Sequence, residues 1–135
     1  MSAAANKAIV QEALDGTANG NGGAFVAMLS DEAKWTIIGT TSWSRTFDGK
    51  PAIVSQLLRP LAANFAGANV VTAGRIVAEG DTVMAEGNNH SVTMNGERYD
   101  NRYVWVFTFR DGKVVDILEY CDTDLVLRLL TTCPG

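Results

Sequence analysis

Hydrophobic and polar positions alternate most clearly over residues 99–124, where two runs rich in β-branched and aromatic residues flank the dipeptide Asp111-Gly112. Such alternation on both sides of a turn dipeptide predicts a long antiparallel hairpin. A two-residue turn would place Glu119 opposite Val104, whereas a three-residue turn would place it opposite Tyr103. We favour the three-residue turn, because a glycine suits the left-handed position that this turn requires.

In the favoured register one face of the hairpin is almost entirely apolar, and Glu119 is its single charge. The residues of this face are Asn101, Tyr103, Trp105, Phe107 and Phe109 with Val115, Ile117, Glu119 and Cys121. Apolar surroundings disfavour the ionised form of a carboxyl group and raise its pKa. Glu119 is therefore a candidate general acid or base. The alternatives are an acid held structurally by Tyr103 and Asn101, or one that reaches solvent.

The rest of the pattern predicts helices first and further strands afterwards. The expected helices are residues 3–14, 24–29 and 52–65, and the expected strands are residues 33–39, 70–78 and 82–93. We expect a kink or a break at Pro60, because proline donates no backbone hydrogen bond. Residues 125–130 are apolar and form a short C-terminal helix or an extended tail.

A second hairpin is predicted at Asn95-Gly96, a dipeptide typical of two-residue turns. In that register His90 lies opposite Asn101 and shares the face of Glu119, provided that a bulge near Gly87-Asn88 switches the facing. His90 is the only histidine, and its ordinary pKa of about 6.5 suits proton transfer. The alternative is an outward-facing strand histidine. Asn88, Asn89 and Asn101 are either ligands of a pocket or amides that satisfy the bulge.

An unusually aromatic connection follows the first expected strand. Residues 40–50 carry Trp43, Arg45 and Phe47. Exposed aromatic side chains are costly to hydrate, so this segment is either a lid over a pocket or a packed loop or dimer contact.

Composition narrows the class of protein. A net charge of -4 without a Lys/Arg cluster excludes nucleic acid and anionic membrane surfaces as partners. No apolar run reaches the roughly 20 residues of a membrane span, and the start lacks a basic and apolar leader, so we expect a cytoplasmic protein. The two cysteines lack metal-ligand spacing, and the glycine-rich residues 16–25 lack the ending of a phosphate loop, so we expect neither a metal nor a cofactor. The length predicts one domain, residues 1–135.

The order of elements over residues 1–128, with the strings YDNRY, VFTFRDGKV and EYCDT, resembles the nuclear transport factor 2-like (NTF2-like) superfamily. Within it the resemblance is to the SnoaL-like and ketosteroid-isomerase-related branch. It implies an α+β, cone-shaped fold with N-terminal helices packed on a curved antiparallel sheet. It also implies a homodimer through the outer sheet face, for which the candidates are Arg102, Val104, Val106, Thr108, Leu118 and Tyr120.

Similarity to the limonene epoxide hydrolases is partial. Glu119 falls where that family has its second catalytic aspartate, and Trp35 falls where it has a water-holding tyrosine. Ile37 stands in place of the water-holding asparagine, and residues 87–90 contain no equivalent of the Arg-x-Asp pair. In the ketosteroid isomerases, the general base occupies the position of Ile37.

These observations predict a cone that binds a flat, hydrophobic small molecule, aromatic or polycyclic. Its expected lining is Trp35, Trp43, Arg45, Asn88, His90, Asn101, Tyr103, Ile117 and Glu119. We expect a cofactor-independent general acid-base enzyme, a lyase, isomerase or cyclase. Glu119 or His90 would take a proton, while Tyr103, Asn101 or Arg45 would hold the developing oxyanion. The alternatives are a non-catalytic binding module and an epoxide hydrolase-like enzyme.

Overall fold

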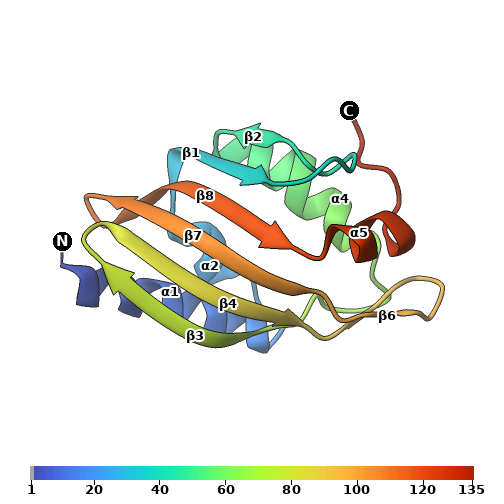
Figure 1. Cartoon of the computed structure of the whole chain (residues 1–135), viewed down its shortest axis with the longest axis horizontal. Coiled ribbons are helices and arrows are strands. Elements are labelled where there is room, and N and C mark those ends of the chain that lie inside the picture. Colours follow the sequence, from blue (N-terminus) through green and yellow to red (C-terminus); the bar gives the residue numbers. More distant parts are fainter. Residues whose placement is uncertain (1) are drawn as a thin grey trace.

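The computed structural model describes residues 2–135 and contains a six-stranded curved sheet with helices packed against its inner side (Figure 1). The helices are α1 (Ala3–Ala18), α2 (Gly23–Ala27), α3 (Lys50–Ala52), η1 (Ile53–Leu58), α4 (Arg59–Ala62) and α5 (Thr123–Leu129). The strands are β1 (Leu29–Ile37), β2 (Thr46–Asp48), β3 (Val71–Glu79), β4 (Thr82–Asn89), β5 (Ser91–Val92), β6 (Arg98–Tyr99), β7 (Arg102–Arg110) and β8 (Lys113–Cys121). The predicted α+β class is confirmed.

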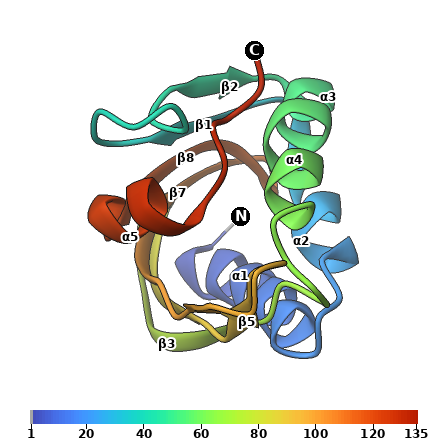
Figure 2. The same ribbon diagram turned by 90° about the vertical axis from the view of Figure 1, so that its right-hand side faces the viewer.

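The strand order is β2-β1-β8-β7-β4-β3, and β5 and β6 form a separate two-stranded sheet. Every pairing in the large sheet is antiparallel except that of β1 with β8, which is parallel. The end-on view shows the sheet curving around an interior that α1 and the helical run α3–α4 enclose on the other side (Figure 2). α5 and the C-terminal segment cross one end of this cone (Figure 2).

The β7–β8 hairpin differs from both predicted registers. Asp111 and Gly112 have φ angles of 51° and 77°, and Arg110 pairs with Lys113, so the turn has two residues. A bulge then places Val115 out of register, and Glu119 pairs with Trp105. The turn and the bulge together restore the predicted facing, because Tyr103, Trp105 and Phe107 share the buried face with Ile117 and Glu119. Val114 replaces Val115 on that face.

The hairpin at Asn95-Gly96 also differs from the prediction. The Thr93 N–H donates to the Glu97 carbonyl, and Gly96 has a φ of 82°, so three residues form the turn. The extra turn residue shifts the register of β4 against β7 by one residue, and Gly87 pairs with Tyr103 without a bulge. Asn89 therefore faces inward, and His90 faces outward.

The helical run from Lys50 to Ala62 does not break at Pro60. Instead η1 is a π-helix, in which the Arg59 N–H reaches the Val54 carbonyl. This wider turn directly precedes the proline, and the Gln56 carbonyl, which an ordinary residue 60 would have bonded, lies 3.9 Å from the Cys133 thiol sulfur. The run ends at Ala62, earlier than predicted. The aromatic connection contains the short strand β2, which the pattern did not predict.

Candidate active site

A cavity of about 680 Å³ occupies the interior of the cone. Its aromatic walls come mainly from the sheet and from α2, and they comprise Phe25, Trp35, Trp43, Tyr99, Tyr103 and Trp105. Leucines of the helical run and the α5 residue Val126 line the other side. Such an apolar enclosure suits a small molecule whose orientation is fixed by a few polar groups.

Glu119 is the acidic residue of this lining. The inward alternation of β8 brings it between Ile37 of β1 and Trp105 of β7, and it is only 7% exposed. The Trp105 indole N–H donates to its Oε1 at 2.9 Å. Within residues 2–135 this is the one hydrogen bond to the carboxyl that meets full geometry, and the Trp35 indole and the Cys121 thiol lie close enough to act on its pKa.

Burial raises the pKa of the Glu119 carboxyl to about 7, because the apolar surroundings disfavour its charge. The indole N–H groups of Trp105 and Trp35 and the Cys121 thiol act in the opposite direction. At neutral pH the Glu119 carboxyl is therefore present in both its protonated and its ionised form. A group that accepts a proton and then returns it needs both forms. Burial and the nearby carboxyl raise the pKa of the Cys121 thiol to about 12, so Cys121 is no nucleophile at neutral pH.

A flat aromatic surface adjoins this carboxyl group. The rings of Tyr103 and Trp105 stack with centroids 4.9 Å apart and planes 12° from parallel. Gly87 makes room for them, because a Cβ at that position would lie 2.4 Å from the Trp105 ring. The stack therefore depends on the absence of a side chain at residue 87.

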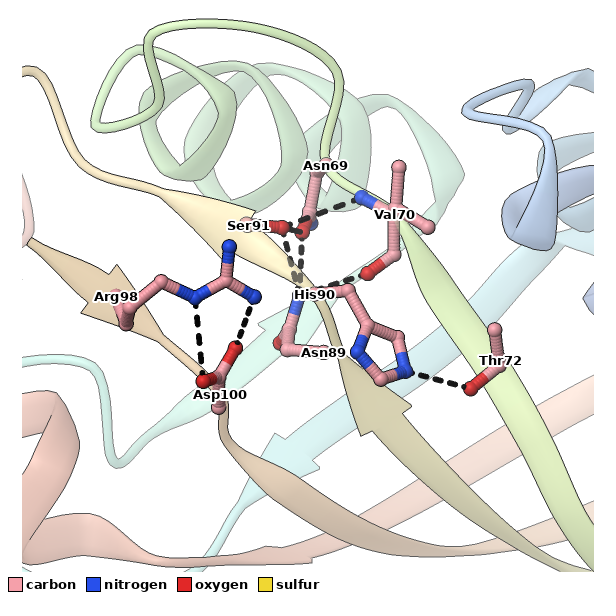
Figure 3. A network of polar contacts seen from close by, with 8 residues as sticks. All are labelled: Asn69, Val70, Thr72, Asn89, His90, Ser91, Arg98 and Asp100. Carbon is pink, nitrogen blue, oxygen red and sulfur yellow. Dashed lines mark hydrogen bonds and ion pairs between the residues drawn. The ribbon is translucent and has the colours of Figure 1, made fainter. Parts of the chain in front are cut away.

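A polar network holds the phenol end of the stack. The Tyr103 hydroxyl donates to Asn89 Oδ1, and Asn89 Nδ2 donates to Asn69 Oδ1 at 2.6 Å and to Ser91 Oγ at 3.1 Å (Figure 3). Asn69 lies on the cavity wall. Because the phenol proton is committed to Asn89, Tyr103 does not offer the proton expected of an oxyanion donor.

Asn101 bonds the cavity-lining residue Tyr99 without lining the cavity itself. Its Nδ2 donates to the Tyr99 hydroxyl at 2.8 Å, and its Oδ1 accepts the backbone N–H groups of Arg102 and Asp122. Asn101 is buried but does not line the cavity. It positions Tyr99 and joins the ends of β7 and β8, which corrects the expectation that it contacts the ligand.

His90 and Asn88 are not brought to the cavity, contrary to prediction. His90 is exposed, and its Nε2 shares a hydrogen bond of 2.9 Å with the Thr72 hydroxyl (Figure 3). Asn88 is half-buried between Thr72 and Arg102 and is absent from the cavity lining. The three-residue turn explains both placements, because it reverses the facing predicted for this strand.

The aromatic connection divides its side chains between the cavity and the surface. Trp43 lines the cavity, and its indole N–H donates to the Thr131 carbonyl at 2.8 Å. The Arg45 guanidinium instead lies over the Phe47 ring and donates to the Pro134 carbonyl, so it does not reach the cavity. Ile117 is fully buried in the core beneath the wall and also lies outside the lining.

Of the predicted site residues, the structure brings together Glu119, Tyr103, Trp35 and Trp43. The sequence placed Trp105 on the face of Glu119 and named Asn89 as a possible pocket amide, but it did not predict that they bond the acid and the phenol. It gave no indication of Asn69. The alternation of β7 places Trp105 beside Glu119, and a three-residue turn would have revealed Asn89. Asn69 lies in a connection whose pattern carries no such signal.

The residues from 10 to 117 match the family model of the SnoaL-like domain. The chain belongs to the SnoaL-like domain family. Among residues 2–135, no helix is long and apolar enough to cross a membrane. The same residues contain no cluster of three His, Cys, Asp or Glu side chains arranged to hold a metal ion.

Solved structures identify the SnoaL-like fold as NTF2-like. An NTF2-like protein of unknown function from Burkholderia pseudomallei is 20% identical with a TM-score of 0.80, and the match covers 97% of this chain and 99% of that one. A proposed SnoaL-like polyketide cyclase from Jannaschia sp. CCS1 is 17% identical with a TM-score of 0.77, over 97% and 94% of the two chains. TerC, co-crystallised with polyporic acid, is 17% identical with a TM-score of 0.78, over 93% and 97%. No curated protein matches the sequence.

Proposed function

We propose that the chain is a cofactor-independent acid-base enzyme for a hydrophobic, aromatic or polycyclic small molecule, and that it is a lyase, isomerase or cyclase. Glu119 is the group that takes and returns the proton. The observation that carries this proposal is a buried carboxyl group with a pKa of about 7 on the wall of an apolar cavity. Carboxyl groups perturbed in this way are candidates for catalysis.

The cavity supports the substrate class. Its aromatic walls offer flat surfaces, and a volume of about 680 Å³ lies within the range of small-molecule sites. The cyclase assignment of one structural neighbour and the polyporic acid in another crystal agree with this class. Tyr103 and Trp105 provide the surface against which a flat ring stacks.

Proton exchange tests this proposal without knowledge of the natural substrate. The probe is 2-tetralone, a bicyclic ketone with acidic C–H bonds next to its carbonyl group. In D2O we expect the protein to accelerate deuterium incorporation at these carbons, measured by proton NMR. Glu119→Gln should abolish the acceleration, because the amide cannot take the proton at neutral pH.

A matched control is Glu97→Gln, which removes an exposed carboxylate on the turn between β5 and β6 and should leave the exchange rate unchanged. Binding of 2-tetralone without any acceleration would contradict the enzymatic proposal. It would favour the second candidate function, a non-catalytic binding module. That alternative is supported by the placement of His90 outside the cavity, which leaves the lining without the imidazole expected to exchange protons beside Glu119.

The assembly and the location of the protein are further parts of the proposal. We propose that residues 1–135 act as one domain, that two copies pair through the outer sheet face, and that the protein works in the cytoplasm. Val104 and Tyr120 are exposed on that face. Cys121 and Cys133 are free thiols, which agrees with a reducing compartment.

A further inference from the structure

Asn69 carries an unused hydrogen-bond donor on the cavity wall, away from Glu119. The residue lies in the segment before β3, lines the cavity and is half-buried. Among residues 2–135 its side chain makes two hydrogen bonds, and Oδ1 accepts both of them, from Asn89 Nδ2 at 2.6 Å and from Ser91 Oγ at 2.9 Å. Neither proton of Asn69 Nδ2 is therefore used by the described part of the chain.

The network fixes which end of the Asn69 amide carries the protons. The side chains of Asn69, Asn89 and Ser91 converge beside the backbone of Val70 (Figure 3). Asn89 Nδ2 lies 3.3 Å from the Val70 carbonyl oxygen, and a carbonyl oxygen can only accept a hydrogen bond. The atom of Asn69 that meets this NH2 group must then be the oxygen, so the NH2 group of Asn69 is turned away from the network.

The NH2 group of Asn69 is accessible to a ligand. Asn89 and Ser91 do not line the cavity, whereas Asn69 does, so its oxygen points toward residues behind the wall. Among residues 2–135, the side-chain atoms that are both unpartnered and closed off from solvent belong to three other residues. Asn69 Nδ2 has no partner and therefore keeps accessible surface. An acceptor oxygen of a ligand can bond it without breaking any bond of the network.

Asn69 and Glu119 lie on different parts of the same wall. The strand order β8-β7-β4-β3 separates Glu119 on β8 from the start of β3, which Asn69 precedes. Three strand spacings of about 4.8 Å amount to roughly 14 Å along the sheet, and the curvature shortens the direct distance. The stacked rings of Tyr103 and Trp105 belong to β7, between the two. A single ring beside Glu119 is too short to reach Asn69, whereas a fused-ring compound is long enough.

We propose that the Asn69 NH2 group binds an acceptor oxygen, a carbonyl or phenol oxygen, at the end of the substrate remote from the carbon that meets Glu119. Asn69 thereby selects fused-ring compounds that carry this oxygen. The role of Glu119 rests on the proposed function, whereas the hydrogen bond at Asn69 needs no turnover. Because Asn89 and Ser91 hold Oδ1, the amide keeps one orientation before the ligand binds, which reduces the entropy lost on binding.

Side-chain amide NMR signals test this hydrogen bond in the wild-type protein. The ¹⁵N-carboxamide resonances of Asn69 are assigned by their loss in Asn69→Asp. The probes are 2-acetylnaphthalene and 2-ethylnaphthalene, which share a flat bicyclic skeleton and differ by the carbonyl oxygen, so the comparison separates the effect of the oxygen from that of the rings. We expect the ketone alone to move an Asn69 N–H resonance downfield. The Asn101 carboxamide is the internal control, because its Nδ2 already bonds Tyr99 and Asp122.

Affinity measurements on variants provide a second readout. Asn69→Asp keeps an oxygen that accepts from Asn89 and Ser91, and it replaces the NH2 group by an oxygen that cannot donate. The ratio of 2-acetylnaphthalene to 2-ethylnaphthalene affinity, measured by quenching of tryptophan fluorescence, should fall roughly fivefold or more, the value of one neutral hydrogen bond. Asn88→Asp is the matched control, since it adds the same charge at a half-buried residue outside the cavity lining. Its ratio should equal that of the wild type.

Two outcomes would overturn the inference. One is a pair of Asn69 amide resonances that move equally with ketone and hydrocarbon. The other is an affinity ratio that stays unchanged in Asn69→Asp, which would assign the carbonyl to another donor. A lowered ratio in Asn69→Asp without deuterium exchange of 2-tetralone would leave this inference standing and contradict only the proposed function. Deuterium exchange with an unchanged ratio would contradict only this inference.

Discussion

At the residue scale, the burial of Glu119 links its proton to the folding of the chain. The pKa of its carboxyl is about 7 in the folded protein, against an ordinary value of 4.5. Between these two values the folded state binds the proton and the unfolded state releases it. The contribution of Glu119 to stability therefore falls as the pH rises from about 4.5 to about 7, and it is constant above that range.

Glu119→Gln should remove this pH dependence. The amide oxygen can still accept the Trp105 N–H, but the side chain no longer titrates. A shift of 2.5 units, from 4.5 to about 7, corresponds to about 3 kcal/mol. We expect the free energy of unfolding of the variant to gain about 3 kcal/mol relative to the wild type between pH 4 and pH 8. Urea denaturation at several pH values measures the difference, and parallel curves for the two proteins would contradict it.

Gly87 determines the geometry of the same site through its missing side chain. A Cβ would lie 2.4 Å from Cη2 and Cζ3 of Trp105, which is far inside contact distance. Gly87→Ala should destabilise the fold by about 1–3 kcal/mol and turn the Trp105 ring away from Glu119. Thermal unfolding and near-UV circular dichroism report the two effects. Gly67→Ala is the control, because no atom lies within 4 Å of its Cβ position, and its effect should stay within about 0.5 kcal/mol.

At the element scale, hairpin turns decide which residues reach the cavity. The alternation of β7 and β8 could be predicted from the sequence, and so could the inward position of Glu119. The register could not, because an Asp-Gly or Asn-Gly pair permits turns of two or three residues and the sequence does not mark the bulge at Val115. Because the turn at Asn95-Gly96 has three residues and not two, Asn89 lies on the inner face in the place predicted for His90.

The remaining site residues depend on contacts between distant elements. Asn69 enters the site only because β3 and β4 pair, and Val126 only because α5 folds over the end of the cone. Neither position carries a periodic signal of its own. The wall positions of Trp35, Tyr103 and Trp105 were predictable, since they follow strand alternation, whereas the hydrogen-bond partners of Glu119 and Tyr103 were not.

The C-terminal segment is held by several hydrogen bonds to other elements. The Thr131 N–H donates to Asn64 Oδ1 at 2.9 Å, and the Cys133 N–H donates to Ser42 Oγ at 2.9 Å. Thr131 also accepts the indole N–H of Trp43, and Leu130 lines the cavity. This segment therefore connects α4, the aromatic connection and the cavity wall.

Asn64→Ala should loosen this segment. The change removes the acceptor of the Thr131 N–H and the donor to the Pro60 carbonyl, and Asn64 is 6% exposed. We expect a loss of about 1–2 kcal/mol in stability and faster amide hydrogen exchange at residues 131–133. Asn19→Ala is the control, because that exposed amide bonds only the Asp15 carbonyl. Unchanged exchange at residue 131 would contradict the role assigned to Asn64.

At the scale of the whole molecule, the inner and outer faces of the sheet differ in what they contact. The inner face builds the cavity, and the outer face carries exposed apolar side chains. Met84, Val104 and Tyr120 are 44%, 37% and 45% exposed, and Val104 pairs directly with Tyr120 across β7 and β8. Clustered apolar side chains on an exposed face are typical of interaction sites, which supports the proposed homodimer.

Val104→Lys should weaken the pairing of two copies without unfolding either. In an isolated chain the lysine reaches water, so the stability of the monomer should change by less than about 0.5 kcal/mol. In the dimer the ammonium group would be buried against a second apolar face, and burying an unpaired charge is costly. We expect the dissociation constant from sedimentation velocity to rise roughly tenfold or more. Leu127→Lys on α5, where Leu127 is 70% exposed, adds the same charge away from the sheet and should leave it unchanged. A wild-type protein that sediments as a monomer at high concentration would rule out the dimer, and equal constants for the two variants would place the contact elsewhere.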